Sequence, residues 1–139
     1  MPDLPRARRW YEWLGEVCAE AGFTAYVPHT RTDPELTRHL DDREVYARDQ
    51  DAHEGATVIV ADIGTPSLGV GGEVASACLS GQPVIALHRI DQHPSRYTRG
   101  QILTAANGQV IAYCDSEDCR RQLLGALAAV RAELAPRGG

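Results

Sequence analysis

The sequence contains no lysine, and all 14 basic residues among its 139 are arginine. The chain therefore cannot form a lysine Schiff base, and it cannot build a Walker-type phosphate loop, which needs a lysine. Its formal charge is −5, because 19 acidic residues outnumber the basic ones. It thus lacks the surplus of positive charge on which binding to a nucleic acid polymer depends. A small phosphate ligand is still compatible with this charge, because a few arginine, serine and backbone N–H groups can bind it locally.

Long apolar runs are also missing from the sequence. No run approaches the roughly 18–20 residues that a membrane-spanning helix requires, and the Arg-rich start lacks the apolar core of a signal peptide. We therefore expect a cytoplasmic protein that does not interact with a membrane. Hydrophobic residues make up 43% and charged residues 24%, which is typical of globular proteins. The length predicts a single domain over residues 1–139.

The four cysteines include no C-x-x-C pair. Cys114 and Cys119 are separated by five positions and have no histidine nearby at ligand spacing, which argues against a zinc site. Cys18 and Cys78 fall on apolar positions of predicted helices. We therefore expect small buried thiols, and we expect neither a metal nor a cofactor.

Strands and helices alternate along the predicted secondary structure. The predicted strands are short apolar segments at Phe23–Val27, Thr57–Ile63, Pro83–Leu87 and Gln109–Tyr113. The predicted helices are Pro5–Ala21, Pro34–Leu40, Asp42–His53, Gly72–Ser80, Ser95–Ala106 and Ser116–Leu134. This alternation predicts an α/β domain of the flavodoxin or Rossmann type, with a four-stranded parallel sheet and helices on both faces.

The loop that follows the strand Thr57–Ile63 is the richest candidate for a ligand site. Ligands of open α/β sheets bind at the carboxyl ends of the strands, where loops lead into helices. In the loop, predicted over Gly64–Gly71, glycines would let backbone N–H groups approach an anion, Ser67 adds a hydroxyl, and the next helix adds its positive dipole end. Such a loop can equally be an ordinary strand-to-helix connection. Glu73, in the first turn of the predicted helix, makes the signal more specific.

Asp49 is a second carboxylate near the same predicted cleft, close to the end of the helix that precedes the strand. Two carboxylates at one cleft are what glycosyl transfer needs, one as the nucleophile and the other to handle protons. Spacing alone leaves a second interpretation open, in which Asp49 is a solvated residue on a helix surface.

Several runs of residues resemble the nucleoside 2-deoxyribosyltransferase superfamily. The likeness is closest to its 2′-deoxynucleoside 5′-phosphate N-hydrolases and CMP N-glycosidases. It covers about residues 22–108, and the string from Pro66 to Glu73, preceded by Arg48-Asp49, is the most specific part. The remaining matching runs are Ala56–Asp62, Gly81–Ile85 and Ser95–Gly100.

The resemblance implies a retaining attack on an N-glycosidic bond. Glu73 matches the family nucleophile, which forms a glycosyl-enzyme ester, and Asp49 matches the carboxylate that positions it and assists proton transfer. Water resolves the ester in the hydrolases, whereas a second base does so in the transferases.

A binding site for a 5′-phosphate is also implied by the resemblance. Ser67 and the N–H groups of Gly69 and Gly71 match the phosphate-binding loop, and Ser95 matches a second phosphate-contacting serine. In this family that serine can come from the partner subunit, so we expect a homodimer with shared active sites. A phosphate-binding loop favours nucleotides over free nucleosides, and hence the hydrolase branch over the transferases.

Three further residues are candidate substrate contacts. His29 follows a predicted strand and could face the cleft, although a capping or surface histidine is the alternative. His88 lies beside the loop after the third predicted strand and could contact the base. Arg99 could pair with the phosphate, but a surface arginine near a helix end would look the same.

The sequence departs from the family pattern at its start. In these proteins a first strand and a Gly-rich loop precede the first helix, whereas here only Met1–Leu4 precede it. In the flavodoxin-like order that strand is internal, between those predicted at Phe23–Val27 and Thr57–Ile63. An upstream start, direct docking of these two strands, or a strand from a partner chain would each avoid unpaired ladders. We expect direct docking for this sequence.

Together these observations predict hydrolysis of a nucleoside 5′-monophosphate to free base and (deoxy)ribose 5-phosphate through a covalent glycosyl-Glu intermediate. Two alternatives remain open: a non-catalytic nucleotide-binding paralogue, and a nucleoside 2-deoxyribosyltransferase that exchanges bases.

Overall fold

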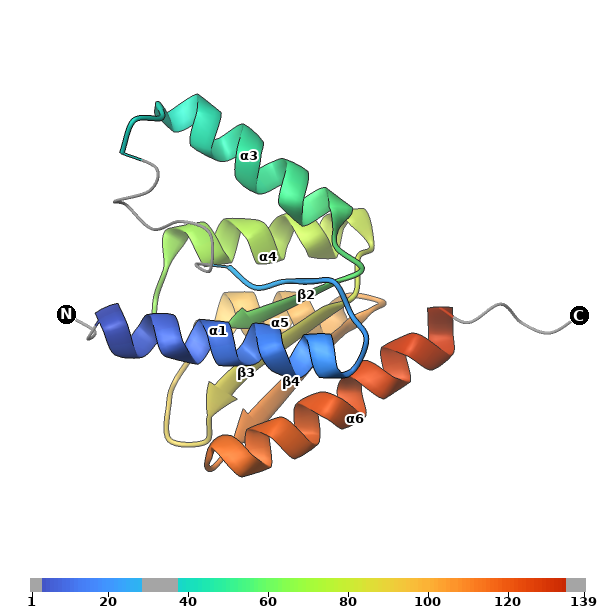
Figure 1. The fold of residues 1–139 in the computed structure, drawn as a ribbon. Helices are drawn as coiled ribbons and strands as arrows, with labels where there is room; N and C mark the ends of the chain where they lie inside the picture. The colour runs from blue at the N-terminus through green and yellow to red at the C-terminus, as the bar shows by residue number, and fades with distance from the viewer. Residues whose placement is uncertain (1–3, 29–37, 135–139) are drawn as a thin grey trace, which may run out of the picture.

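The computed structural model describes residues 4–28 and 38–134, and within them the chain forms one parallel sheet with helices on both faces (Figure 1). The strands are β1 (Ala25–Tyr26), β2 (Val58–Asp62), β3 (Val84–Arg89) and β4 (Gly108–Tyr113), and they lie in that order. The helices of this region are α1 (Leu4–Glu20), α3 (Asp42–Gly55), α4 (Leu68–Ser80), α5 (Arg96–Thr104) and α6 (Ser116–Leu134). The predicted α/β class and the four strands are confirmed.

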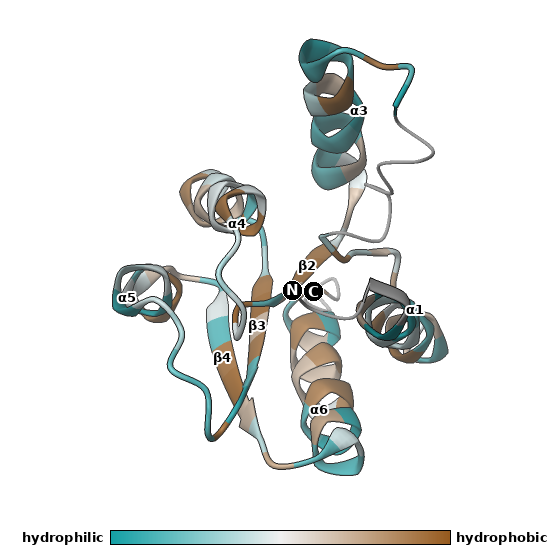
Figure 2. Cartoon of the chain, turned by 90° about the vertical axis from the view of Figure 1, so that its left-hand side faces the viewer, coloured by the Kyte–Doolittle hydropathy of each residue, from teal (hydrophilic) through white to brown (hydrophobic). Residues whose placement is uncertain are grey.

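Alternating side chains of the strands divide the core between the two faces of the sheet. Val58 and Val60 of β2 pack with α1 and α6, whereas Ile59 and Ala61 pack with α4 and α5. Figure 2 shows α4 and α5 on one side of the sheet and α1 and α6 on the other. Since both faces are covered, the central strands are apolar almost throughout.

The short strand β1 pairs directly with β2. Its two residues align with Val58 and Ile59 in parallel register. This is the direct docking that we expected, and it places Tyr26 beside Ile59, on the face of the sheet that α4 covers.

Helix α4 begins earlier than the sequence predicted. The prediction placed a loop up to Gly71 and a helix from Gly72, but the helix starts at Leu68. Ser67 is the reason, because it caps the helix by accepting a hydrogen bond from the N–H of Val70 at 3.3 Å. The connecting loop is therefore confined to residues 63–67, and the glycines at 69 and 71 belong to the first turn of a helix.

Two other expectations have mixed outcomes. Most of the predicted helix Pro34–Leu40 lies outside the described residues, and residues 38–40 form a turn and a bend. Cys18 and Cys119 are buried as expected, and burial raises the pKa of these thiols to about 11 and about 12. Cys114 is exposed and Cys78 is only half-buried, which corrects the expectation of buried thiols for these two residues.

None of the described helices is both long enough and apolar enough to cross a membrane.

Candidate active site

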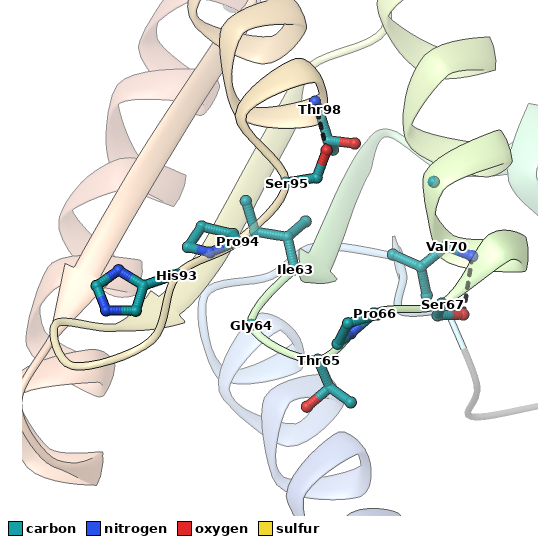
Figure 3. A pocket seen from close by; sticks show the side chains of 11 residues that line it. Ile63, Gly64, Thr65, Pro66, Ser67, Val70, His93, Pro94, Ser95 and Thr98 are labelled. Carbon is teal, nitrogen blue, oxygen red and sulfur yellow. Dashed lines mark hydrogen bonds between the residues drawn. The ribbon is translucent and has the colours of Figure 1, made fainter.

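A cavity of about 270 Å³ lies between the N-terminal ends of α4 and α5 (Figure 3). Its lining comes from the segment after β2 and from the loop before α5: Ile63, Gly64, Thr65, Pro66, Ser67, Val70, Gly71, His93, Pro94, Ser95 and Thr98. The cavity therefore lies beyond the carboxyl end of β2, where ligands of open α/β sheets bind.

Ser67 and Ser95 occupy equivalent positions on the two helices. Each is an N-cap: Ser67 Oγ accepts from the N–H of Val70 at 3.3 Å, and Ser95 Oγ accepts from the N–H of Thr98 at 3.2 Å (Figure 3). A serine hydroxyl can accept such a bond and still donate its own proton to a ligand. Two helix N-termini with their capping hydroxyls thus face one cavity, an arrangement suited to a phosphate-sized anion.

The glycines of the predicted phosphate loop have different positions in the helix. Gly69 is the second residue of α4, where a backbone N–H has no carbonyl partner within the helix. The N–H of Gly71 instead donates to the carbonyl oxygen of Ser67 at 3.1 Å. Gly71 lines the cavity, and a Cβ added there would meet nothing within 4 Å.

Glu73 lies three residues after Val70, on the neighbouring surface of α4. Its side chain is half-buried and does not line the cavity itself. The Tyr26 hydroxyl donates a hydrogen bond to Glu73 Oε1 at 2.9 Å. A carboxylate held in one orientation beside a cavity has the chemistry needed of a nucleophile.

Helix α3 carries two titratable side chains that act on Glu73. Asp49 and His53 are four residues apart, which puts them on one side of the helix. His53 Nε2 lies 3.0 Å from the backbone oxygen of Glu73. A carbonyl only accepts, so in this contact Nε2 carries the proton.

These neighbours act on the pKa of Glu73 in opposite directions. Burial is the largest effect and raises the pKa above its usual range, and the negative charge of Asp49 raises it further. The hydrogen bond from Tyr26 and the charge of His53 lower it. The two carboxylates singled out in the sequence therefore lie within electrostatic reach of each other, although their residues are 24 positions apart.

The remaining predicted contacts have varied outcomes. His29 lies outside the described residues. His88 is buried on β3, where Nδ1 lies 2.7 Å from the carbonyl oxygen of Arg89, and no described residue hydrogen-bonds to Nε2. Arg99 is exposed on α5 and does not line the cavity. No group of side chains in the described ranges could hold a metal ion.

Comparison with known proteins places the chain in a family. No family model matches the chain. A protein of Thermofilum pendens, provisionally named 2′-deoxynucleoside 5′-phosphate N-hydrolase 1, is 34% identical over 111 residues, which are 79% of this chain and 78% of that protein. The chain belongs to the 2′-deoxynucleoside 5′-phosphate N-hydrolase family. A member from Methanosarcina mazei with the same provisional name is 32% identical over 110 residues, 77% of this chain and 66% of that protein.

A solved structure has the same fold as this N-hydrolase family member. CMP N-glycosidase BcmB of Clostridium botulinum superposes with a TM-score of 0.56 at 21% identity, over 71% of this chain and 96% of that protein. The suspected relationship to the N-hydrolases is thus confirmed in sequence and the predicted fold in structure.

Sequence reasoning missed four residues of the site. Thr65 and Thr98 line the cavity, and Tyr26 and His53 contact Glu73. A signal for Thr98 was present, because it follows Ser95 by three positions in a predicted helix start. Tyr26 carries no local signal, since its contact joins residues 47 positions apart.

Proposed function

We propose that this protein hydrolyses the N-glycosidic bond of a nucleoside 5′-monophosphate, releasing the free base and (deoxy)ribose 5-phosphate. One observation carries the proposal: the anion cavity and the Glu73 carboxylate lie on the same helix, α4. The related N-hydrolases and BcmB, whose names describe this class of reaction, support it.

In the first step, a carboxylate oxygen of Glu73 attacks C1′ of the sugar. The C1′–O ester bond forms while the C1′–N bond to the base breaks, and the bonding electron pair leaves with the base nitrogen. The two carboxylates share one proton in the reactive state: Glu73 is ionised, and Asp49 carries the proton that neutralises the departing base. Its position on α3, within electrostatic reach of Glu73, supports this role.

In the second step, water attacks C1′ of the glycosyl-Glu73 ester. Its hydroxyl oxygen bonds to C1′, the ester bond breaks, and Glu73 regains its carboxylate. The proton released by the water passes to Asp49, which restores the starting state. Two displacements at C1′ retain its configuration.

The phosphate selects nucleotides in this proposal. The Ser67 and Ser95 hydroxyls and the N–H of Gly69 would hold the 5′-phosphate at the paired helix starts. Gly71 would contribute open space, because its N–H is used within the helix. No metal or other cofactor enters the reaction.

The test uses a panel of ribo- and deoxyribonucleoside monophosphates, with free base detected by chromatography. We expect base release from at least one monophosphate and markedly less from its unphosphorylated nucleoside. Measurable binding with no base released from any of them would overturn the proposal in favour of a nucleotide-binding protein. Exchange of an added free base into a nucleoside would identify a transferase instead.

The homodimer remains a prediction. Ser67 and Ser95 line one cavity within a single chain, so a partner is not needed to bring these two serines together. Exposed apolar side chains on α4 and α5, among them Leu68 and Tyr97, are available to a second copy. Light scattering coupled to size exclusion measures the mass in solution and so decides between monomer and dimer.

A further inference from the structure

The hydroxyl of Tyr26 makes the two oxygens of the Glu73 carboxylate unequal. It donates to Oε1 at 2.9 Å, and within the described part of the chain Oε2 has no hydrogen-bond partner. Tyr26 is 5% exposed and lies on β1, in register with Ile59. The Tyr26 hydroxyl, on strand β1, therefore fixes Oε1, while Oε2 remains available to react.

We propose that Tyr26 is a positioning residue that assigns the nucleophilic role to Glu73 Oε2, an inference that rests on the function proposed above. When Oε2 bonds to C1′, Oε1 becomes the carbonyl oxygen of the ester. A carbonyl oxygen still accepts a hydrogen bond. The Tyr26 hydroxyl can thus keep the same partner in the carboxylate and in the ester, which keeps Glu73 in one orientation through both displacements.

The ring of Tyr26 is itself fixed by its surroundings. It meets the imidazole of His53 edge-on, with ring centroids 5.7 Å apart. His53 is 1% exposed and also contacts the backbone oxygen of Glu73. Glu73 is thereby held at two points, its side chain by Tyr26 and its backbone by His53.

The hydrogen bond also affects the charge state of the nucleophile. Burial and Asp49 raise the pKa of Glu73, and both therefore oppose the ionised form that attacks C1′. Tyr26 from β1 and His53 from α3 act in the other direction. Removing the Tyr26 hydroxyl should raise the Glu73 pKa and move the acid limb of activity to higher pH.

The test compares Tyr26→Phe with the wild type, because phenylalanine keeps the ring and removes only the hydroxyl. We expect kcat to fall by about 10- to 100-fold, the usual effect of losing a hydrogen bond to a charged group. The KM for the monophosphate should change less than twofold, since Tyr26 does not line the phosphate cavity. Tyr113→Phe, a second buried tyrosine at the opposite edge of the sheet, is the matched control and should keep wild-type kinetics.

A readout without substrate separates this inference from the proposed function. NMR titration of the Glu73 side-chain carboxyl carbon should give a higher pKa in Tyr26→Phe than in the wild type. In the wild type alone, the Tyr26 Cζ resonance should follow the same titration, so the coupling can be tested without any variant. If the wild type released no base, the proposed function would fail while these titrations still decided the coupling. An unchanged Glu73 pKa in Tyr26→Phe, or unchanged kcat and pH profile in an active enzyme, would overturn the role of Tyr26.

Discussion

His53 on α3 contacts the backbone oxygen of Glu73 on α4 through Nε2, at 3.0 Å. It is the one buried residue of α3, and its own carbonyl oxygen accepts a hydrogen bond from Gln82 Nε2 at 2.8 Å. The rest of the helix is strongly polar, and Figure 2 shows it projecting away from the sheet. His53 therefore fixes α3 against α4, and with it the position of Asp49, which lies one turn earlier and acts electrostatically on Glu73.

We expect His53→Leu to lower kcat by about tenfold, because α3 loses its hydrogen bond to α4 and Asp49 its fixed position. The free energy of unfolding should change by less than about 1.5 kcal/mol, since leucine has a similar volume and removes the buried, unpartnered Nδ1. Base-release kinetics and chemical denaturation measure the two effects. Glu54→Gln, on the exposed side of α3, is the control. Full activity in His53→Leu would contradict the anchoring role.

Replacing Glu73 by glutamine should abolish base release, because an amide cannot form the glycosyl ester. The same change should make the fold more stable at neutral pH. The pKa of Glu73 is higher in the folded than in the unfolded protein. Stability is therefore lost as the pH rises from the unfolded to the folded pKa, because the buried carboxylate becomes charged. Glutamine avoids that loss. Thermal unfolding should therefore show a higher midpoint for Glu73→Gln at pH 7, with the difference shrinking as the pH is lowered.

Activity equal to wild type in Glu73→Gln would contradict the nucleophile assignment. A midpoint difference that grows on acidification would contradict the direction of the pKa shift. Asp51→Asn, an exposed residue of α3, is the control for loss of one negative charge.

Ser95→Asp tests the phosphate site without removing the helix cap. Aspartate is as good an N-cap as serine, so α5 should keep its start. Its negative charge would, however, face the bound phosphate, and we expect the KM for the monophosphate to rise by at least about tenfold. Hydrolysis of the unphosphorylated nucleoside, however slow, should be unaffected. A parallel loss with both substrates would indicate damage to the fold, which circular dichroism would detect.

Gly108 and Gly125 form a matched pair for stability. A Cβ on Gly108 would collide with the backbone carbonyl of Ile102 in α5, whereas at Gly125, inside α6, it would meet nothing within 4 Å. We expect Gly108→Ala to destabilise the protein by about 1–3 kcal/mol. Gly125→Ala should stabilise it by about 0.5–1 kcal/mol, because glycine is a poor helix residue. Urea denaturation measures both values, and equal effects of the two changes would contradict the close approach of β4 to α5.

The sequence predicted most of this fold because its signals are local. The strand Thr57–Ile63 is an unbroken apolar run, and α6 repeats leucines at helical spacing, so both elements are found within about one residue at each end. A local contact also ends the strand β2, because the Gly64 N–H donates a hydrogen bond to Asp62 Oδ1 at 2.8 Å.

Local reasoning failed where glycine and tertiary contacts decide the outcome. The glycines at 69 and 71 suggested a loop, but the Ser67 cap and the packing of Val70 and Val74 extend α4 through them. His53 looked like the end of a polar helix, and only the approach of α4 reveals that it is buried. The contact between Tyr26 and Glu73 depends on the pairing of β1 with β2, which the sequence suggested only as one of three arrangements.

Helix α4 carries Ser67 at its N-cap and Glu73 six residues later. At about 1.5 Å of rise per residue, these two positions are separated by roughly 9 Å along a rigid axis. In the proposed reaction, the backbone of a single helix thus sets the spacing between the serine that would hold the phosphate and the carboxylate that would react with the sugar. An insertion or deletion between residues 67 and 73 would also rotate Glu73 by about 100° around the axis. This short segment should therefore tolerate substitutions on its exposed side but no change in length.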